Sequence, residues 1–433
     1  MDVKKGYKQT EVGVIPDDWE VETIGELFSI SGGFSSSRDQ LSDEGFCYLH
    51  YGDIHKSNKT YINIEEEYPE IPKLNIDLRS ISPKSLLIDG DAVFVDASED
   101  DEGASKHVVI RNSRGIPYIS GLHTIVIKSH DDSVVNLYKQ FCFQTSNVKK
   151  QFKFYAVGTK VTGISKTNIA KIQIALPSTK AEQTAIATAL SDADVLIGNL
   201  EKIIAKKRNV KQGAMQQLLT GKKRLSGFTG EWETKRFPDV CWFQEGPGVR
   251  NIQFTQFGVK LLNGTNIYRG RLLLDNTDRF ISESEAFGPY AHFLVDTGDI
   301  VIACSGITVD RFDEKVSFVK KEHLPLCMNT STMRFKTRGK LFHSAYLYYY
   351  LMSNEFKRQI GSQATGSAQL NFGPYHVKRV EITLPKLEEQ IAIATVLSDS
   401  DAEIEALEKK LAKYRFIKQG MMQQLLTGKK RLI

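Results

Sequence analysis

The sequence predicts a duplicated mixed α/β (α+β) protein, in which two globular domains are each followed by a long helical region. Three observations predict this fold. Residues 183–225 and 390–432 are nearly identical, apolar residues recur in both with the spacing of a helix face, and strand-like runs occupy matching places upstream. The period of about 208 residues is far too long for a solenoid. The expected parts are a globular domain at 1–175, a helical region at 176–225, a globular domain at 226–383 and a helical region at 384–433.

Each globular domain is expected to combine a sheet with a helix. Runs rich in Val, Ile, Phe and Thr alternate with polar, glycine-rich loops such as residues 31–38. Rigid sheets that carry polar loops suit the reading of base edges in DNA. The expected strands are 92–95, 124–127, 172–175, 300–303, 332–335 and 380–383, and the expected helices are 135–152 and 345–360.

The duplication is strong in the helical regions and weak in the globular domains. At an offset of 207, 30 of the 43 residues in 183–225 and 390–432 are identical, whereas upstream only isolated matches persist, such as Thr124 with Thr332. Two like tails indicate two copies of one partner, and two unlike globular domains indicate two different targets. A recent duplication without function would have left the globular halves as similar as the tails.

Each helical region is expected to hold a short helix followed by a long one. Thr179 and Glu182 have the spacing of a capping box, which predicts the first helix start. The Ser-Asp pairs at 191–192 and 398–399 are expected to cap the second helix. The expected helix ends are the glycines that follow the apolar pattern, Gly221 and Gly428.

The two long helices are expected to pack as an antiparallel coiled coil, which would close the chain into a pseudo-twofold circular arrangement. Lysines fall on the apolar seam, so pairing is expected to loosen or to admit a partner there. The alternative is an ordinary helix pair with no partner. The side chains expected to form this spacer and partner-docking surface are Leu190, Ile197, Leu200, Lys211, Leu218, Leu397, Ile404, Leu407, Lys418 and Leu425.

Two loops at the same place in the repeat are the best candidates for DNA contact, together with the loop 31–38. Residues 158–166 and 366–371 offer hydroxyls and backbone N–H groups for phosphates, and Lys, Gln or Asn for base edges. Their differing chemistry fits two different half-sites, and the alternative is a pair of solvated loops without function. The candidate residues are Ser35, Arg38, Thr159, Lys160, Thr162, Ser165, Lys166, Ser367, Gln369 and Asn371.

Several kinds of chemistry have no motif in this sequence. It contains no GxxxxGK[ST] phosphate loop, no GxGxxG, no HExxH and no Asn-Pro-Pro-aromatic motif. The five cysteines are scattered, and the acidic run 96–102 is interpreted as a solvated loop rather than a nuclease metal site. We therefore expect no catalytic residue, metal or cofactor on this chain. With no apolar run of bilayer length and no signal peptide, a cytoplasmic protein is expected, and the net charge of +5 is compatible with DNA binding.

The order of segments and several motifs resemble type I restriction-modification specificity subunits over essentially the whole chain. Each tail opens with Leu-Pro followed by Glu-Gln, at 176–177 and 182–183 in the first and at 384–385 and 389–390 in the second. The start, YKQTEVGVIP at 7–16 followed by Trp19, is also similar to this family.

The resemblance implies two target-recognition domains, each reading one half of a bipartite site in double-stranded DNA. The helical regions would set the spacing and dock two modification (M) subunits, which transfer methyl groups from S-adenosylmethionine to adenine. Restriction (R) subunits that use ATP and Mg²⁺ would join them. The basic residues of the first tail would touch either spacer phosphates or acidic partner surfaces: Lys202, Lys206, Lys207, Arg208 and Lys211.

Three other functions compete with this interpretation. An orphan DNA-binding adaptor of another phage-defence system would share the fold but not the partner. A nuclease or methyltransferase in its own right would need the motifs that are missing. A coiled-coil scaffold that does not bind DNA would not need two large loop-rich domains.

Overall fold

The computed structural model describes residues 4–57, 59–98, 105–158, 162–339, 341–361 and 369–432. The chain forms two compact units, which are described separately. Unit 1 comprises Met1–Glu201 and Lys409–Ile433, and unit 2 comprises Lys202–Glu408. Each unit therefore contains one globular domain, the first part of the long helix that follows it and the last part of the other long helix. The expected boundaries at 175 and 383 fall in strands that lead directly into these helices.

Unit 1 is built on a five-stranded sheet of order β4-β13-β9-β11-β7. Its middle strands, β13 and β9, are buried on both faces, which explains their nearly continuous apolar sequence. A second sheet has the order β12-β6-β8-β5. The strands of the first sheet are β4 (Phe28–Gly32), β7 (Tyr61–Asn63), β9 (Ala92–Val95), β11 (His107–Arg111) and β13 (Thr124–Ser129), and those of the second are β5 (Leu41–Ser42), β6 (Phe46–Leu49), β8 (Lys73–Leu74) and β12 (Tyr118–Ser120).

The remaining strands of unit 1 form two-stranded pairs, and its short helices cover the sheets. The pairs are β1 (Tyr7–Thr10) with β2 (Gly13–Pro16), β3 (Glu20–Thr23) with β15 (Gln173–Leu176), and β10 (Ala97–Ser98) with β14 (Thr162–Gly163). The helices are α1 (Ile24–Leu27), α2 (Tyr51–Lys56), α3 (Ile64–Glu67), α4 (Asn136–Cys142), α5 (Ser146–Tyr155) and α6 (Lys166–Ile169).

Unit 2 repeats this plan. Its main sheet has the order β17-β26-β22-β24, and the pairing of Met333 with Glu245 reproduces that of Ile125 with Gly32 in unit 1. These strands are β17 (Cys241–Glu245), β22 (Ile300–Ala303), β24 (Val316–Phe318) and β26 (Thr332–Thr337); the others are β16 (Glu233–Arg236), β18 (Val259–Leu262), β19 (Ile267–Tyr268), β20 (Arg271–Leu272), β21 (Phe280–Ile281), β23 (Ile307–Thr308), β25 (Leu326–Met328), β27 (Gln369–Leu370) and β28 (Glu381–Leu384).

All six expected strands are present, but each expected domain helix is two helices. Residues 135–152 form α4 and α5, and residues 345–360 form α10 (Ser344–Leu351) and α11 (Asn354–Gly361). A side-chain cap causes each break: the Thr145 hydroxyl accepts the Val148 N–H, and the Ser353 hydroxyl accepts the Phe356 N–H. The other helices of unit 2 are α8 (Phe237–Val240), α9 (Glu283–Phe287) and α12 (Pro374–Val377).

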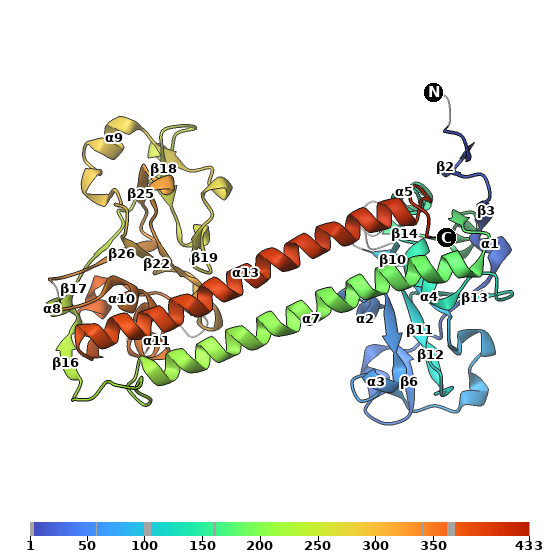
Figure 1. Ribbon diagram of the computed structural model, residues 1–433, viewed down its shortest axis with the longest axis horizontal. Helices are drawn as coiled ribbons and strands as arrows, with labels where there is room; N and C mark the ends of the chain where they lie inside the picture. Colours follow the sequence, from blue (N-terminus) through green and yellow to red (C-terminus); the bar gives the residue numbers. More distant parts are fainter. Residues whose placement is uncertain are drawn as a thin grey trace. The chain divides into compact units, whose positions relative to one another are not determined.

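The long helices α7 (Lys180–Leu218) and α13 (Leu387–Leu425) are each continuous over 39 residues (Figure 1). The prediction of a short helix before each long one is therefore wrong. The hydroxyls of Ser398 and Ser400 donate to carbonyls of the preceding turn instead of capping a new helix. The predicted ends are confirmed, because Gly221 and Gly428 adopt φ of 68° and 66° just after the last turns.

Within each unit, the two helix segments are antiparallel. In unit 1, Asp194 pairs with Lys418 and Glu201 with Arg415, so residue numbers increase along α7 in the direction in which they decrease along α13. The equivalent pair in unit 2 joins Lys211 to Asp401 at 2.5 Å. The last turn of each helix also completes the other domain's core, because Leu425 and Leu426 pack in unit 1 and Leu218 and Leu219 in unit 2.

Candidate nucleic-acid interface

In unit 1, the candidate loops meet at one edge of the five-stranded sheet. β4 ends there at Gly32, β9 ends at Val95 and β13 begins at Thr124, which pairs with Val95. The Lys166 nitrogen would lie only 2.7 Å from a Cβ at Gly32, so its ammonium group rests against this strand end. We call residues 32–38, 95–97, 122–124 and 162–166 the loop edge of unit 1.

The described candidates of unit 1 are mostly accessible. Ser35, Arg38, Ser165 and Lys166 are exposed, and Thr162 is half-buried in β14. Ser165 also has a structural role, because its hydroxyl accepts the Asn168 N–H at the start of α6. The other two candidates, Thr159 and Lys160, lie outside the described residues.

Unit 2 has the same edge with different side chains. We call residues 245–257, 303–308, 329–332 and 369–373 the loop edge of unit 2. Gln369 is exposed in β27. Asn371 is half-buried, and its Oδ1 accepts the Gly306 N–H at 2.8 Å and the Ser305 hydroxyl at 3.0 Å, so this oxygen holds the turn after β22. Ser367 lies outside the described residues.

Residues 246–258 form a loop that the sequence interpretation missed. It occupies the place of residues 33–45 in unit 1, and both loops contain a short 3₁₀ turn in which a glutamine accepts the N–H of the residue three before it. Ile252 is 90% exposed and Phe257 is 78% exposed. The sequence repeat is hard to recognise here because equivalent residues of the two units are 213 positions apart instead of 208. The spacing of Gly, Gln and Gly that both loops share is the signal that would have revealed it.

A group of histidines at the loop edge of unit 1 was also missed. His123 Nδ1 lies 3.2 Å from an Asp96 carboxylate oxygen, and the Tyr51 ring meets the His123 ring edge-on at 5.5 Å. His50 packs on Tyr51 at 4.5 Å and caps α2 by accepting the Gly52 N–H. These residues are scattered along the chain, so no local spacing motif could show them.

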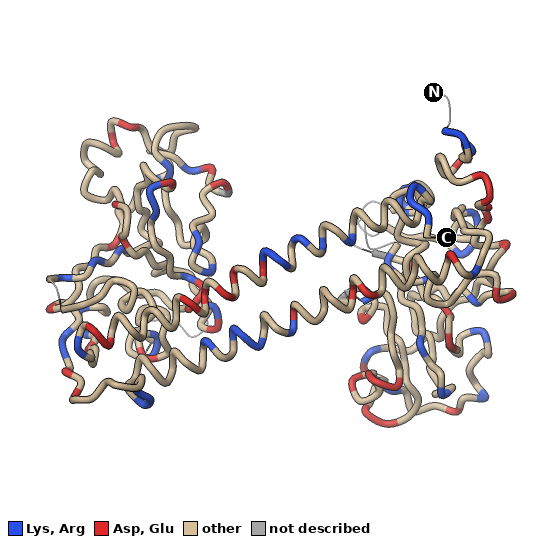
Figure 2. Tube along the Cα trace, in the orientation of Figure 1, with Lys and Arg blue, Asp and Glu red and all other residues tan. Residues whose placement is uncertain are grey.

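The candidate docking residues of the long helices lie largely inside their own units. Leu190, Leu200, Leu218, Leu397, Ile404 and Leu425 are buried, and Ile197 and Leu407 are half-buried. The seam lysines Lys211 and Lys418 are paired within the chain, each with an aspartate at 2.5 Å. Lys207 pairs with Glu403, and Arg208 with Glu408. Figure 2 shows charges of both signs along α7 and α13.

The described part of the chain offers neither a metal site nor a membrane-spanning helix. It contains no group of three His, Cys, Asp or Glu side chains placed to hold a metal ion. None of its helices is both long and apolar enough to cross a membrane. The five cysteines are all buried and unpaired, and burial raises the thiol pKa of Cys327 to about 12.

Comparison with known proteins identifies the family. The family described as "Type I restriction modification DNA specificity domain" matches residues 16–207 and 229–413, which together make up most of the chain. The chain belongs to the type I restriction-modification specificity-subunit family. Its function is therefore DNA recognition within such a system, and the two matched segments correspond to the two halves of the duplication.

Two relatives from the specificity-subunit family match nearly the full length of this chain. The type I restriction enzyme MjaVIII specificity subunit of Methanocaldococcus jannaschii is 26% identical over 99% of this chain and 97% of its own length. The putative MjaX specificity subunit of the same organism is 24% identical with the same coverage. The S subunit structure from M. genitalium superposes with a TM-score of 0.55 at 12% identity, covering 98% of both chains. A chain from a structure of type I R-M complex assembly gives 0.58 at 14% identity, covering 96% of this chain and 99% of that one.

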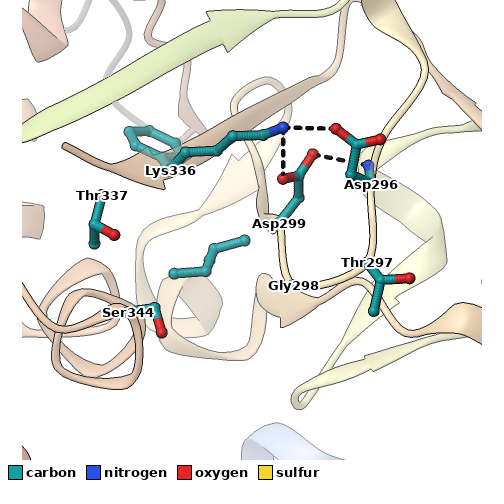
Figure 3. A pocket seen from close by; sticks show the side chains of 9 residues that line it. Asp296, Thr297, Gly298, Asp299, Lys336, Thr337 and Ser344 are labelled. Atoms are coloured by element: carbon teal, nitrogen blue, oxygen red, sulfur yellow. Dashed lines mark hydrogen bonds and ion pairs between the residues drawn. The ribbon is translucent and has the colours of Figure 1, made fainter. Parts of the chain in front are cut away.

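A cavity of about 260 Å³ in unit 2 of this specificity subunit lies at the sheet edge opposite to its loop edge. There Lys336 lies between Asp296 and Asp299, at 2.7 and 3.1 Å (Figure 3). Although burial opposes it, hydrogen bonding to these carboxylates raises the pKa of Lys336. Unit 1 repeats the pair as Asp91 with Lys128. In unit 2, Arg334 also lies 3.4 Å from Asp299, so two cations balance the two carboxylates and we assign the cavity a structural role.

Proposed function

We propose that this specificity subunit reads a bipartite site in double-stranded DNA, with one half-site at the loop edge of each unit. One observation carries the proposal: the two edges share a backbone hydrogen bond at equivalent positions and differ in side-chain chemistry. Where unit 1 has Asp96 and His123, unit 2 has Cys304 and Ser331, yet the first residue of each pair donates its N–H to the carbonyl of the second. A common scaffold with different donors and acceptors suits two readers of different base sequences.

In this proposal, α7 and α13 pack as an antiparallel coiled coil that sets the spacing of the half-sites. They also dock two adenine methyltransferase (M) subunits. The support is that the helix contacts occur twice, since Lys418 with Asp194 and Lys211 with Asp401 are the same contact in the two units. Two equivalent surfaces fit two copies of one partner. The exposed faces of the helices would meet the partner, because the apolar seam is buried in the chain's own packing.

The chemistry in this proposal belongs to the partners. The subunit itself binds no cofactor and has no catalytic residue. The methyltransferase subunits bind S-adenosylmethionine and flip the target adenine out of the duplex, and restriction (R) subunits contribute the reactions that need ATP and Mg²⁺. The complex would act in the cytoplasm, where the DNA is.

The experiment that tests the proposal is a genome-wide map of methylated adenine in the host, with this gene intact and with it deleted. Loss of one bipartite methylated motif on deletion is the expected result, and it also yields both half-sites and the spacer length. An unchanged map, with the gene shown to be expressed, would contradict the proposal and favour an orphan DNA-binding adaptor of another phage-defence system.

A further inference from the structure

We propose that His123, oriented by Asp96, is a specificity-determining residue of the first half-site and accepts a hydrogen bond from the exocyclic amino group of an adenine or cytosine. This inference rests on the proposed function, because it assigns one base contact to the reader in unit 1. It deepens that proposal by naming the residue and the chemical group it recognises.

The backbone holds His123 at the surface of the loop edge. His123 adopts φ of 58°, a left-handed conformation that few residues other than glycine occupy. Its carbonyl accepts the Asp96 N–H at 3.1 Å, so the turn before β13 is tied to the end of β9. The His123 side chain is nevertheless 49% exposed, so its ring stands at the accessible surface of the loop edge.

Asp96 and Tyr51 fix the orientation of the imidazole ring of His123. The Asp96 carboxylate can only accept, so Nδ1 of His123 donates to it across 3.2 Å. In the neutral ring, Nε2 is then the acceptor. The Tyr51 ring, edge-on at 5.5 Å, also contacts the imidazole. In the major groove, adenine and cytosine present N–H donors that such an acceptor can read.

The surroundings of the pair suit DNA. His55 lies next to it, with Nε2 3.2 Å from the Ala97 carbonyl, and the Lys106 ammonium donates to the His55 carbonyl at 2.8 Å. Lys166 lies at the same edge, against Gly32. Cationic groups around a base-reading side chain provide phosphate contacts that hold the duplex in register.

Unit 2 indicates that the His123–Asp96 pair serves DNA recognition rather than the stability of the fold. At the places of Asp96 and His123 it has Cys304 and Ser331, and the same backbone hydrogen bond forms at 2.9 Å. The Ser331 hydroxyl turns inward to accept the Gly264 N–H at 3.0 Å. The fold of this edge therefore does not need a histidine–carboxylate pair. Because a half-exposed pair also adds little stability, its presence in one unit only points to recognition.

The test uses the full chain co-expressed with its methyltransferase partner, and adenine methylation is mapped for wild type, His123→Ala, Asp96→Asn and the matched control Ser331→Ala. For His123→Ala we expect one position of one half-site to become degenerate, with discrimination there falling on the order of tenfold, while the other half-site is unchanged. Asp96→Asn should weaken discrimination at the same position, because an amide can donate as well as accept and no longer fixes Nδ1 of His123 as the protonated nitrogen. Ser331→Ala should leave that half-site intact.

The outcomes separate this inference from the proposed function. If wild type produces no bipartite methylated motif, the proposed function fails. If wild type produces the motif and folded His123→Ala, checked by thermal unfolding, methylates it with unchanged preference at every position, only this inference is overturned. A uniform loss of methylation without a change of motif would also overturn it. Full discrimination in Asp96→Asn would overturn the positioning role of Asp96.

Discussion

At the scale of single residues, the environment decides what each side chain can do. His107 and His123 are both histidines of unit 1. His107 is 6% exposed and lies between Phe94, whose ring is tilted to it at 5.1 Å, and Phe143, which meets it edge-on at 5.2 Å, whereas His123 stands at the surface beside Asp96. The sequence contains both residues without distinguishing them, because their neighbours come from distant parts of the chain. The candidate loops could be predicted, but the individual residues that form the edge could not.

His107 leads to a prediction about pH. Burial lowers its pKa to about 4, so the folded protein holds it neutral, whereas the unfolded chain protonates near 6.5. This contribution to stability is complete above pH 6.5 and is lost as the pH falls toward 4. Between pH 7.5 and 5 the protein should lose about 2 kcal/mol of unfolding free energy from this residue, measured by denaturant unfolding at both values.

The variant His107→Phe is the control for this effect. It keeps an aromatic ring between Phe94 and Phe143 and removes the titrating group. Its stability should depend less on pH than that of wild type, by the same 2 kcal/mol, roughly. Equal losses in both proteins would show that other groups cause the pH dependence.

At the scale of elements, the bounds of the long helices depend both on local sequence patterns and on packing. Apolar spacing predicted both helices, and the glycines predicted both ends. The Ser-Asp pairs suggested an extra helix start, but burial of Leu190 and Leu397 on one face stabilises a continuous helix through these positions. Conversely, Thr145 and Ser353 each end one helix and cap the next, where the apolar pattern had predicted a single continuous helix. A polar residue therefore caps or continues a helix according to what the neighbouring turns bury.

The segment that follows α13 leads to a second prediction. Arg431 donates to Glu182 at 2.7 Å and to Asp18 at 2.8 Å, and Glu182 is 3% exposed. Arg431→Ala would leave a buried carboxylate without its cation, which should destabilise unit 1 by roughly 3 kcal/mol. Hydrogen exchange should then speed up in residues 7–23 and leave unit 2 unchanged. The neighbouring Lys430→Ala, at an exposed position, should change neither unit, and equal effects of the two substitutions would contradict this role.

At the scale of the whole molecule, each globular domain depends on residues at the end of the long helix that follows the other globular domain. Leu425 and Leu426 complete the first core, and Leu218 and Leu219 complete the second. The loop edge of unit 1, in contrast, is built only from residues 32–166. The residues of a loop edge can therefore change while the long helices stay the same. This fits a chain whose helical regions are alike and whose globular domains differ.

Exchange of one domain tests this independence. Replacing residues 226–383 with the corresponding domain of a relative should change one half of the methylated motif, because the loop edge of unit 1 lies outside the exchanged segment. Methylation mapping provides the readout, and the reciprocal exchange of residues 1–175 should change the other half. If either exchange altered both halves, the two-reader interpretation would be wrong.

The sequence by itself determined the duplication, the six main strands, the two long helices and the family resemblance. These depend on local periodicity and on identity between segments, both of which can be read along the chain. Only the tertiary structure decided which helix end completes which core, that the seam lysines pair with aspartates, and that His123, Asp96 and Tyr51 meet at one edge. The physical reason is that these contacts join residues far apart in sequence, whose positions are set by the register of strands and the packing of helices.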